Sequence, residues 1–280
     1  MTNSLSADFP LQRVCRVFDV PRSSLYQVRL ARTTADPERA RLHAKVIALH
    51  TAGRHAAGSR TLSAQLKAQG EPVGRFKAGR LMKECALESV QPPKREYRKA
   101  ERVSHIADNL VDRQFTVEAP NQVWCTDVTQ ILVAGQWLYL AVVLDLYGRR
   151  AVGWALSDSP DSALTCRAVR MAFEHRNRPT GTLIHSDQGC HFTSQAYQRC
   201  VQALGIRHSM SRRGNCWDNA PMERFFRSMK TEWIQKKLYR DRPYAVADIT
   251  EYVGHFYNHR RPHSVNDYLT PAAFELTNAA

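Results

Sequence analysis

The sequence lacks three features that would mark a secreted, zinc-binding or membrane protein. Its seven cysteines are widely spaced and include no C-x-x-C pair, which excludes a disulfide framework and a zinc finger. Residues 1–30 are interrupted by charges and contain no apolar core of a signal peptide. The longest apolar run, Trp137 to Leu144, is far too short to cross a bilayer. We therefore expect a soluble protein of a reducing cytoplasm, with no membrane partner.

The sequence also has fewer acidic residues than basic ones. The chain of 280 residues carries 40 Lys and Arg against 26 Asp and Glu, a formal net charge of +14. Residues 1–110 hold 20 of the basic residues and only 10 of the acidic ones. This surplus indicates a polyanionic partner, nucleic acid before a membrane, bound chiefly by the N-terminal part.

The N-terminal part is expected to be all-α. Residues 11–28 place apolar side chains on one helical face and then turn into a second short helix that carries Arg22, which fits a helix-turn-helix or two ordinary core helices. Residues 37–87 form a second helical block, where Arg80 lies on a basic helix that either follows a phosphate backbone or is simply solvated. The Pro-rich basic stretch after it reads as a linker.

Strand patterns replace helical ones from Asn121 onward. Three β-rich runs with short turns predict an antiparallel meander, and helices then alternate with a strand ending near Asp187 and a short strand at 206–211. The sequence therefore predicts an α/β domain with a mixed five-stranded sheet flanked by helices.

Two aspartates occupy unusual places in these strands. Asp127 lies in the middle of the first strand, and Asp187 ends the fourth. If these strands are neighbours the two carboxylates face each other, and such a pair repels unless it is protonated or bridged by a cation. Oxygen ligands of this kind suit Mg²⁺ or Mn²⁺, so we expect a divalent metal site here.

A helix further along the chain offers a third carboxylate. Glu223 falls in its first turn, where the helix N-terminus favours a negative charge, and Asp218 or Asn219 is the expected N-cap. Lys230 follows seven residues later and projects from the same face, about 10 Å along the axis. Such a helix suits a position along a DNA strand.

These residues resemble the DD(35)E(K/R) signature of retroviral integrases and bacterial insertion-sequence transposases, because 35 residues separate Asp187 from Glu223. The sequence segments around these residues narrow the resemblance to the downstream-frame (OrfB) transposases of the insertion-sequence-three family. They are "VWCTDVTQI", "LDLYGRRAVGW", "HSDQGCHFTS", "SMSRRGNCWDNAPMERFFRSMKTE" and "YNHRRPH".

The resemblance implies an RNase H-like catalytic core that binds two Mg²⁺ ions, with Mn²⁺ as an alternative. It implies a DDE transposase that cleaves DNA at insertion-sequence ends and joins a 3′-OH to a phosphodiester, acting as a homo-oligomer on DNA. The expected organisation is a helix-turn-helix-like segment at 1–35, a helical DNA-binding domain at 36–88, a basic linker at 89–110 and the catalytic domain at 111–280. Family members often act with an upstream-frame (OrfA) protein that supplies a coiled coil. No heptad repeat is visible in this sequence, so we leave open whether the chain recognises its ends unaided.

Several basic, polar and aromatic residues are candidates for DNA contact. They are Arg22, Arg80, Arg212, Arg213, Asn215, Trp217, Arg227, Lys230, Arg260, Arg261 and His263. Trp217 either stacks on an unpaired base or fills the core, and residues 258–263 either bind a phosphate or form an ordinary capped helix end.

Other candidates have simpler interpretations. Asp145 precedes a turn, where a carboxylate commonly accepts backbone N–H bonds, and Asp218 is placed to cap the helix. His185 and His191 match no zinc spacing, so packing or DNA contact is expected of them. The alternative functions are a metal nuclease that only hydrolyses, and a DNA-binding regulator with an inactive core. The three intact carboxylates argue against the second.

Overall fold

The computed structural model describes residues 11–17, 19–24, 26, 36–90, 106–212, 216–235 and 237–278. The first element is α2 (Leu11–Val17), and a helical turn at 22–24 follows it. The remaining residues of the predicted helix-turn-helix and most of the predicted linker lie outside the described residues.

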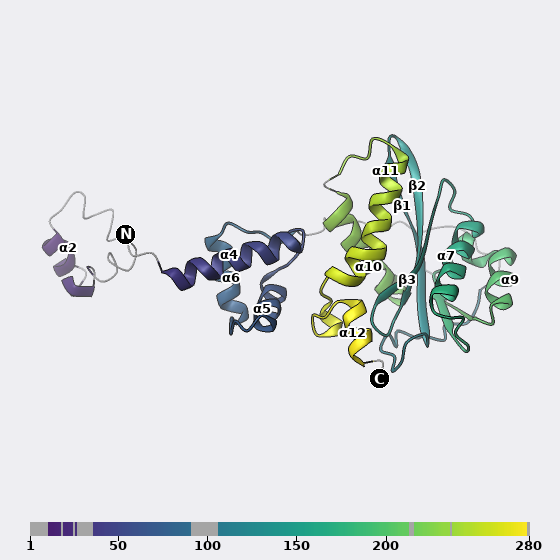
Figure 1. The fold of residues 1–280 in the computed structure, drawn as a ribbon, viewed down its shortest axis with the longest axis horizontal. Coiled ribbons are helices and arrows are strands. Elements are labelled where there is room, and N and C mark those ends of the chain that lie inside the picture. Colours follow the sequence, from purple (N-terminus) through teal and green to yellow (C-terminus); the bar gives the residue numbers. More distant parts are fainter. Residues whose placement is uncertain are drawn as a thin grey trace.

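Three helices form a unit with a core of its own (Figure 1). They are α4 (Pro37–Ala52), α5 (Ser59–Ala68) and α6 (Arg75–Glu84). Asp36 begins the first of them, because its side chain accepts the backbone N–H groups of Glu38 and Arg39. Leu62 and Leu66 are fully buried, as their spacing on one helical face predicts.

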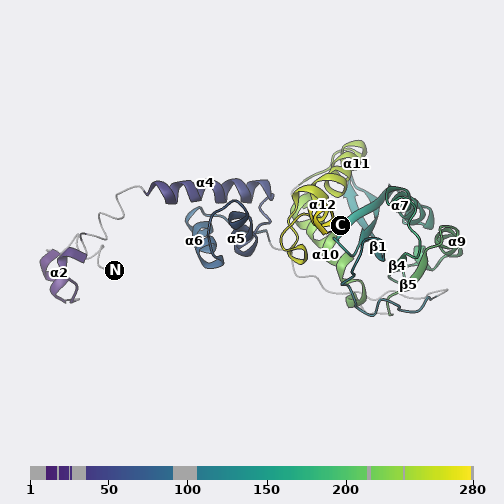
Figure 2. The same ribbon diagram turned by 60° about the horizontal axis from the view of Figure 1, so that its bottom comes forward.

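The rest of the chain is built on one sheet of five strands, in the order β3-β2-β1-β4-β5. The strands are β1 (Val123–Val133), β2 (Gln136–Asp145), β3 (Arg150–Ser157), β4 (Leu183–Ser186) and β5 (Arg207–Met210). The first three form an antiparallel meander, whereas β4 pairs with β1 and β5 pairs with β4 in parallel (Figure 2). The predicted mixed sheet of five strands is confirmed.

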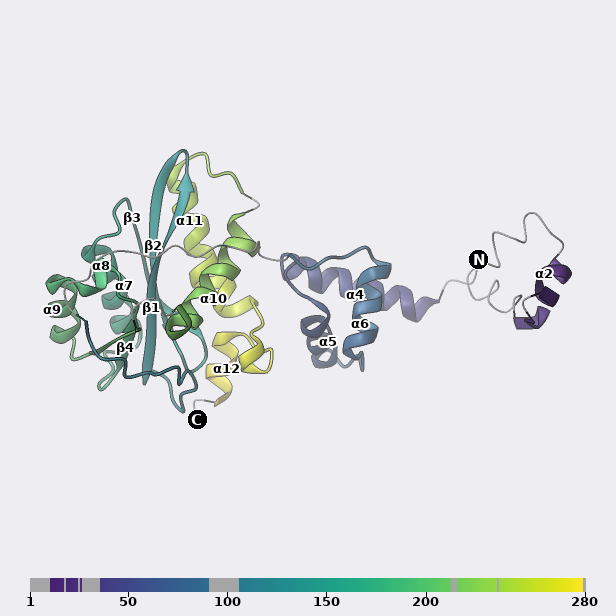
Figure 3. The same ribbon diagram turned by 180° about the vertical axis from the view of Figure 1, so that it is seen from behind.

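Helices cover both faces of this sheet (Figure 3). One face packs on α7 (Ser162–His175), α8 (Cys190–Thr193) and α9 (Gln195–Ala203). The other packs on α10 (Ala220–Met229), the π-helix η2 (Lys230–Ile234), α11 (Arg242–Glu251) and the π-helix η3 (Tyr252–Arg260). The 3-10 helices η1 (Cys216–Asn219) and η4 (Ser264–Asn266) and the helix α12 (Pro271–Asn278) complete the fold.

The central strands show why both faces need a cover. Along β2, Val142 and Leu144 pack toward α10, whereas Ala141 and Val143 pack toward α7. Because neighbouring side chains in a strand point to opposite faces, a strand that is apolar at every position must be buried on both. This arrangement places the sheet, with Asp127 on its central strand β1, between two helical layers.

The helical unit touches the sheet domain on the side that α10 and α11 cover (Figures 1 and 3). The guanidinium carbon of Arg54 lies 3.6 Å from the ring centroid of Trp233, a cation–π contact. Among the described residues, the chain has no helix of the length and apolarity that a bilayer crossing needs.

Candidate active site

The parallel pairing of β1 with β4 brings the two predicted aspartates together. Cys125 is opposite His185 in this ladder. Asp127 lies two residues further along β1, and Asp187 directly follows the last residue of β4, so both come just beyond this pair. The neighbour relation on which the prediction depended is therefore present in the sheet.

The environment of Asp127 shows how close the two charges are. Burial raises the pKa of Asp127 well above its usual value, and the charge of Asp187 raises it further. The backbone N–H of Val128 donates to Asp127 Oδ1 at 2.7 Å and opposes the shift. Asp187 Oδ1 accepts the N–H of Gly189 at 2.9 Å. A like-charged pair held in this way favours a bound cation or proton.

Glu223 and Lys230 come to this pair from a separate element. Glu223 adds to the rise in the pKa of Asp127, and the positive charge of Lys230 lowers it, so both lie within electrostatic range. Glu223 itself is exposed, and burial raises its pKa while Arg227 opposes the rise. The helix α10 ends at Met229, and a wider π-helical turn begins at Lys230.

The three carboxylates do not form a closed metal cage in this conformation. Among the described residues, no three His, Cys, Asp or Glu side chains are arranged to hold an ion. The donor chemistry of Asp127, Asp187 and Glu223 nevertheless fits a hard divalent cation, because all three are carboxylates and two of them repel each other.

The turn after Asp187 requires a glycine. A Cβ at Gly189 would lie 2.9 Å from the ring of His191 and 3.0 Å from Asp187 Oδ1. His191 Nε2 is buried and finds no hydrogen-bond partner among the residues that the structure describes, and burial lowers the pKa of His191. His185 is fully buried and its Nδ1 lies 2.9 Å from Ser209 Oγ, which agrees with the packing interpretation.

The prediction that Asp218 caps the helix α10 is wrong, and the alternative, Asn219, is correct. The N-cap of α10 is Asn219, which makes no side-chain capping bond. Asp218 is fully buried and instead accepts bonds from Asn109 Nδ2, from Arg113 Nε at 2.8 Å and from three groups of Arg212. This carboxylate joins the segment before the sheet to the segment before α10.

Asp145 is structural, as predicted. Its carboxylate accepts the backbone N–H groups of Asn121 at 2.8 Å and Tyr147 at 3.1 Å. Arg176 contributes an ion pair to the same carboxylate at 3.2 Å. These partners satisfy the carboxylate, and Asp145 is not among the groups that shift the pKa of Asp127.

The candidate DNA contacts before and within α10 have different surroundings. Trp217 is 69% exposed, so it does not fill the core. Arg212 is paired with both Asp218 and Asp112, whereas Arg227 is exposed. The candidates Arg213 and Asn215 lie outside the described residues.

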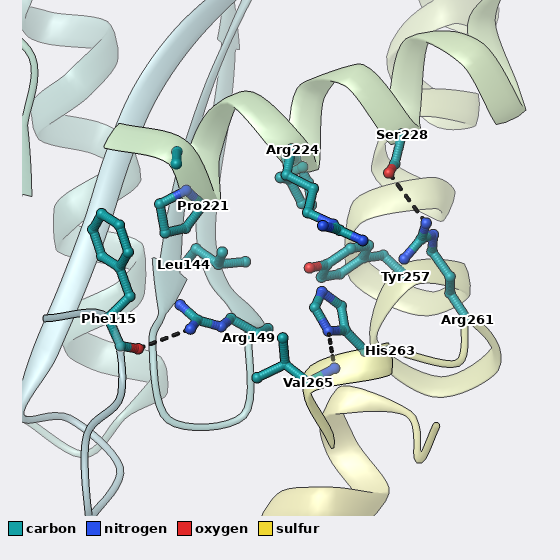
Figure 4. Close-up of a pocket in the computed structure, with 12 residues that line it drawn as sticks. Phe115, Leu144, Arg149, Pro221, Arg224, Ser228, Tyr257, Arg261, His263 and Val265 are labelled. Carbon is teal, nitrogen blue, oxygen red and sulfur yellow. Dashed lines mark hydrogen bonds between the residues drawn. The ribbon is translucent and has the colours of Figure 1, made fainter. Parts of the chain in front are cut away.

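The remaining candidates lie away from the carboxylates. Arg22 and Arg80 are exposed on the N-terminal helices, and Arg260 is exposed at the end of η3. Arg261 and His263 line a pocket on a different side of α10, together with Arg149 and Arg224 (Figure 4). Asp127 is not among the residues that line this pocket.

Several residues that bind the Asp218 carboxylate or line the pocket at Arg261 were not predicted from the sequence. Asn109 and Arg113 hold Asp218 from about a hundred residues away, and no local pattern announces such a partnership. Arg149 lies in the segment "LDLYGRRAVGW". The sequence signal for its unusual position was its place next to a tight turn that contains a glycine. Arg224 follows Glu223 directly and reads as an ordinary helix-surface residue.

Comparisons with known proteins agree with this architecture. An HTH-like domain matches residues 37–95, and two integrase core domain families match residues 117–216 and 204–271. An insertion element IS600 31 kDa protein of Shigella sonnei is 37% identical over 267 residues, covering 93% of this chain and 97% of that protein. Transposase InsF for insertion sequence IS3A of Escherichia coli K12 is 33% identical over 283 residues, covering 98% and 96%.

One solved structure is a more distant match. A chain of the simian T-cell lymphotropic virus intasome in complex with the PP2A regulatory subunit B56 gamma aligns with a TM-score of 0.49 and 18% identity, covering 78% of this chain and 70% of that chain. Nothing about function follows from a similarity of this strength. The sequence relatives, by contrast, match almost end to end and share the integrase core. The chain therefore belongs to the IS3 family of insertion-sequence transposases, enzymes of the polynucleotidyl transferase type.

Proposed function

We propose that this chain cleaves DNA at the ends of an insertion sequence and transfers the resulting 3′-OH to a phosphodiester, in the cytoplasm of a bacterium. Asp127, Asp187 and Glu223 are the catalytic residues in this proposal. The inference goes beyond family membership, because it assigns a metal-dependent reaction to particular side chains of this chain.

The observation that carries the proposal is the parallel register of β1 and β4. Asp127 lies on β1, and Asp187 follows β4, the strand that pairs with β1. Burial and the charge of Asp187 both disfavour the charged form of Asp127 and raise its pKa. Glu223 and Lys230 lie within electrostatic range of the same carboxylate. A half-buried acidic pair of this kind is unfavourable by itself and is typical of a functional site.

Each carboxylate has a defined task. Asp127 and Asp187 are the two fixed oxygen ligands, because each is held by a backbone N–H bond. Glu223 is the ligand that approaches when DNA binds, since it starts exposed on the first turn of α10. Two Mg²⁺ or Mn²⁺ ions held there would activate the attacking oxygen and stabilise the leaving one.

Basic and aromatic side chains near α10 hold the DNA strand. Lys230 and Arg227 lie on the side of the helix that faces the carboxylates, where they neutralise phosphate charge. Trp217 is exposed just before the helix, and a ring in that position can stack on an unpaired base at the element end. Arg212, Arg213, Asn215 and Arg260 are proposed to contact the backbone around this strand.

The N-terminal helices are proposed to recognise the element ends. Arg22 and Arg80 are exposed on them, and an HTH-like domain matches residues 37–95. Two element ends have to be processed together, so we propose a homo-oligomer on DNA in which each copy supplies one active site. An upstream-frame partner of the OrfA type would add a further DNA-binding element.

The test uses labelled duplexes that carry the ends of the host element, incubated with Mg²⁺ and the full chain. Glu223→Gln should abolish both cleavage and joining, because the amide cannot serve as an anionic ligand. Glu251→Gln is the matched control, since Glu251 is equally exposed but lies on α11. Equal product from Glu223→Gln and wild type would refute the assignment of Glu223.

A second substrate separates transposition from simple hydrolysis. A pre-cut end with a free 3′-OH should be joined to a second duplex by the wild-type chain. Hydrolysis without any joined product would instead identify a metal nuclease, and would refute the strand-transfer part of the proposal.

A further inference from the structure

A cavity of about 150 Å³ opens beside α10, and the residues that line it do not include Asp127, Asp187 or Glu223 (Figure 4). Three arginines and one histidine line it, and among its lining residues, all of them within the described part of the chain, there is no Asp or Glu. Glu223 and Arg224 are consecutive on the helix, so their side chains leave it about 100° apart. The cavity is therefore separate from the proposed active site.

Arg149 is the unusual residue of this cavity. Its side chain is buried, with 8% of the residue exposed, and it forms no ion pair among the described residues. Its Nη2 donates to the carbonyl oxygen of Phe115 at 2.8 Å, but its Nη1 is buried and has no hydrogen-bond partner within the described part of the chain. Leaving such a donor unsatisfied costs about 1–3 kcal/mol.

The backbone of Arg149 adds a second cost. Its φ of 56° lies in the left-handed region, which is unfavourable for a residue other than glycine. Strained, buried and unpaired cations are retained where something else compensates for them, and a bound anion would do so. Burial lowers the pKa of Arg149, and the nearby charge of Asp145 offsets that shift only in part.

The other two arginines of the cavity differ in whether their charge is already compensated by an ion pair. Arg261 binds Glu232 through two hydrogen bonds of 2.8 and 2.7 Å and also donates to Ser228. Its charge is therefore compensated. Arg224 is exposed at the rim and forms no ion pair with any described residue.

His263 supplies a neutral donor. Its Nδ1 accepts the backbone N–H of Val265 at 3.4 Å, which leaves the proton on Nε2. Burial, followed by the charges of Arg261, Arg149 and Arg224, lowers the pKa of His263 to about 3. The imidazole is therefore uncharged at neutral pH and can donate one hydrogen bond without adding to the cationic repulsion.

We infer that this cavity binds a phosphate oxyanion, with Arg149 as its buried anchor, Arg224 at its rim and His263 as a neutral donor. A guanidinium group presents two parallel N–H bonds that match two phosphate oxygens. Ala220 and Pro221 also line the cavity, so the positive N-terminal end of α10 faces the same space. The phosphate comes either from a DNA strand or from a free phosphate compound.

The experiment measures binding of inorganic phosphate to the full chain by titration calorimetry, at constant ionic strength and without divalent ions. Wild type should bind saturably below about 10 mM. Arg224→Gln should bind at least about tenfold more weakly, and so should Arg149→Lys, which keeps the charge but removes the fork. Arg199→Gln on α9, which removes an equal charge elsewhere, should bind like wild type.

Two results would overturn the inference. Wild type may not saturate in this range, or all four proteins may bind equally, which would mean that phosphate binds elsewhere. Because Arg224 is exposed, its variant is expected to fold and gives a result even if Arg149→Lys is unstable.

A second arm identifies the source of the phosphate. If the ligand is DNA, a 5′-phosphorylated trinucleotide should displace inorganic phosphate, and its uncharged methylphosphonate analogue should not. If the trinucleotide does not compete, the site serves free phosphate compounds. The assay contains neither element-end DNA nor Mg²⁺, so its failure leaves the proposed transposase chemistry standing, and the reverse is also true.

Discussion

Replacing Asp218 with asparagine tests whether a single buried carboxylate fixes the approach to the catalytic helix. Asp218 is completely buried and accepts bonds from Asn109, Arg113 and Arg212. Breaking a fully buried ion pair from one side costs about 3–5 kcal/mol. Here the arginine side chains are 48% and 52% exposed, so they recover hydration, and we expect a loss of about 2–3 kcal/mol in the free energy of unfolding.

Tryptophan fluorescence during urea unfolding is the appropriate assay. All five tryptophans lie between Trp124 and Trp233, so the signal reports on the sheet domain alone. Asp112→Asn is the control, because Asp112 contacts the same Arg212 at 3.1 Å but is 68% exposed, and its loss should cost at most about 0.5 kcal/mol. Strand cleavage should fall in Asp218→Asn, since η1 leads directly into α10. Equal unfolding free energies for the two variants would refute this reasoning.

Three further predictions follow from burial and close packing. The pKa of His263 is about 3 in the fold and about 6.5 when unfolded, so the unfolded chain binds the extra proton and about 2 kcal/mol of stability is lost between pH 7.5 and 5. His263→Asn should remove that part of the loss in urea titrations at the two pH values, and an unchanged pH dependence would contradict it. Gly153→Ala should cost about 3 kcal/mol or more, because the new Cβ would lie 2.3 Å from the carbonyl oxygen of Ala168, whereas Gly74→Ala, with open space, should be nearly neutral in thermal melts. Asp127→Asn should raise the melting temperature in EDTA by a few degrees, because it removes a partly buried charge beside Asp187. The same variant should no longer be stabilised by Mg²⁺. A lower melting temperature in EDTA would contradict the repulsion between the two carboxylates.

The sequence predicted the sheet well because its signals are local. Strand runs broken by short turns define the meander from Val123 to Ser157, and Pro221 with the apolar stripe after it defines α10. The spacing of Asp187 and Glu223 indicated a family whose members match this chain almost from end to end.

The predictions that failed concern structural details that depend on partners far away in the sequence. Asp218 has the sequence of a helix cap, but Arg113 and Arg212 draw its carboxylate away from the helix. The widening of the catalytic helix at Lys230 has no local signature either, because an α-turn and a π-turn use the same residues.

By itself, the sequence determined the α/β class and the order of the strands along the chain, and it singled out three acidic residues as candidates, since periodicity and spacing are properties that a sequence shows directly. Only the tertiary structure decided that Asp127 and Asp187 extend from paired strands, that Glu223 stays exposed, and that Arg149 is buried next to Arg224 and His263. The physical reason is that burial and charge proximity depend on which segments pack together, and packing joins residues that lie far apart along the chain.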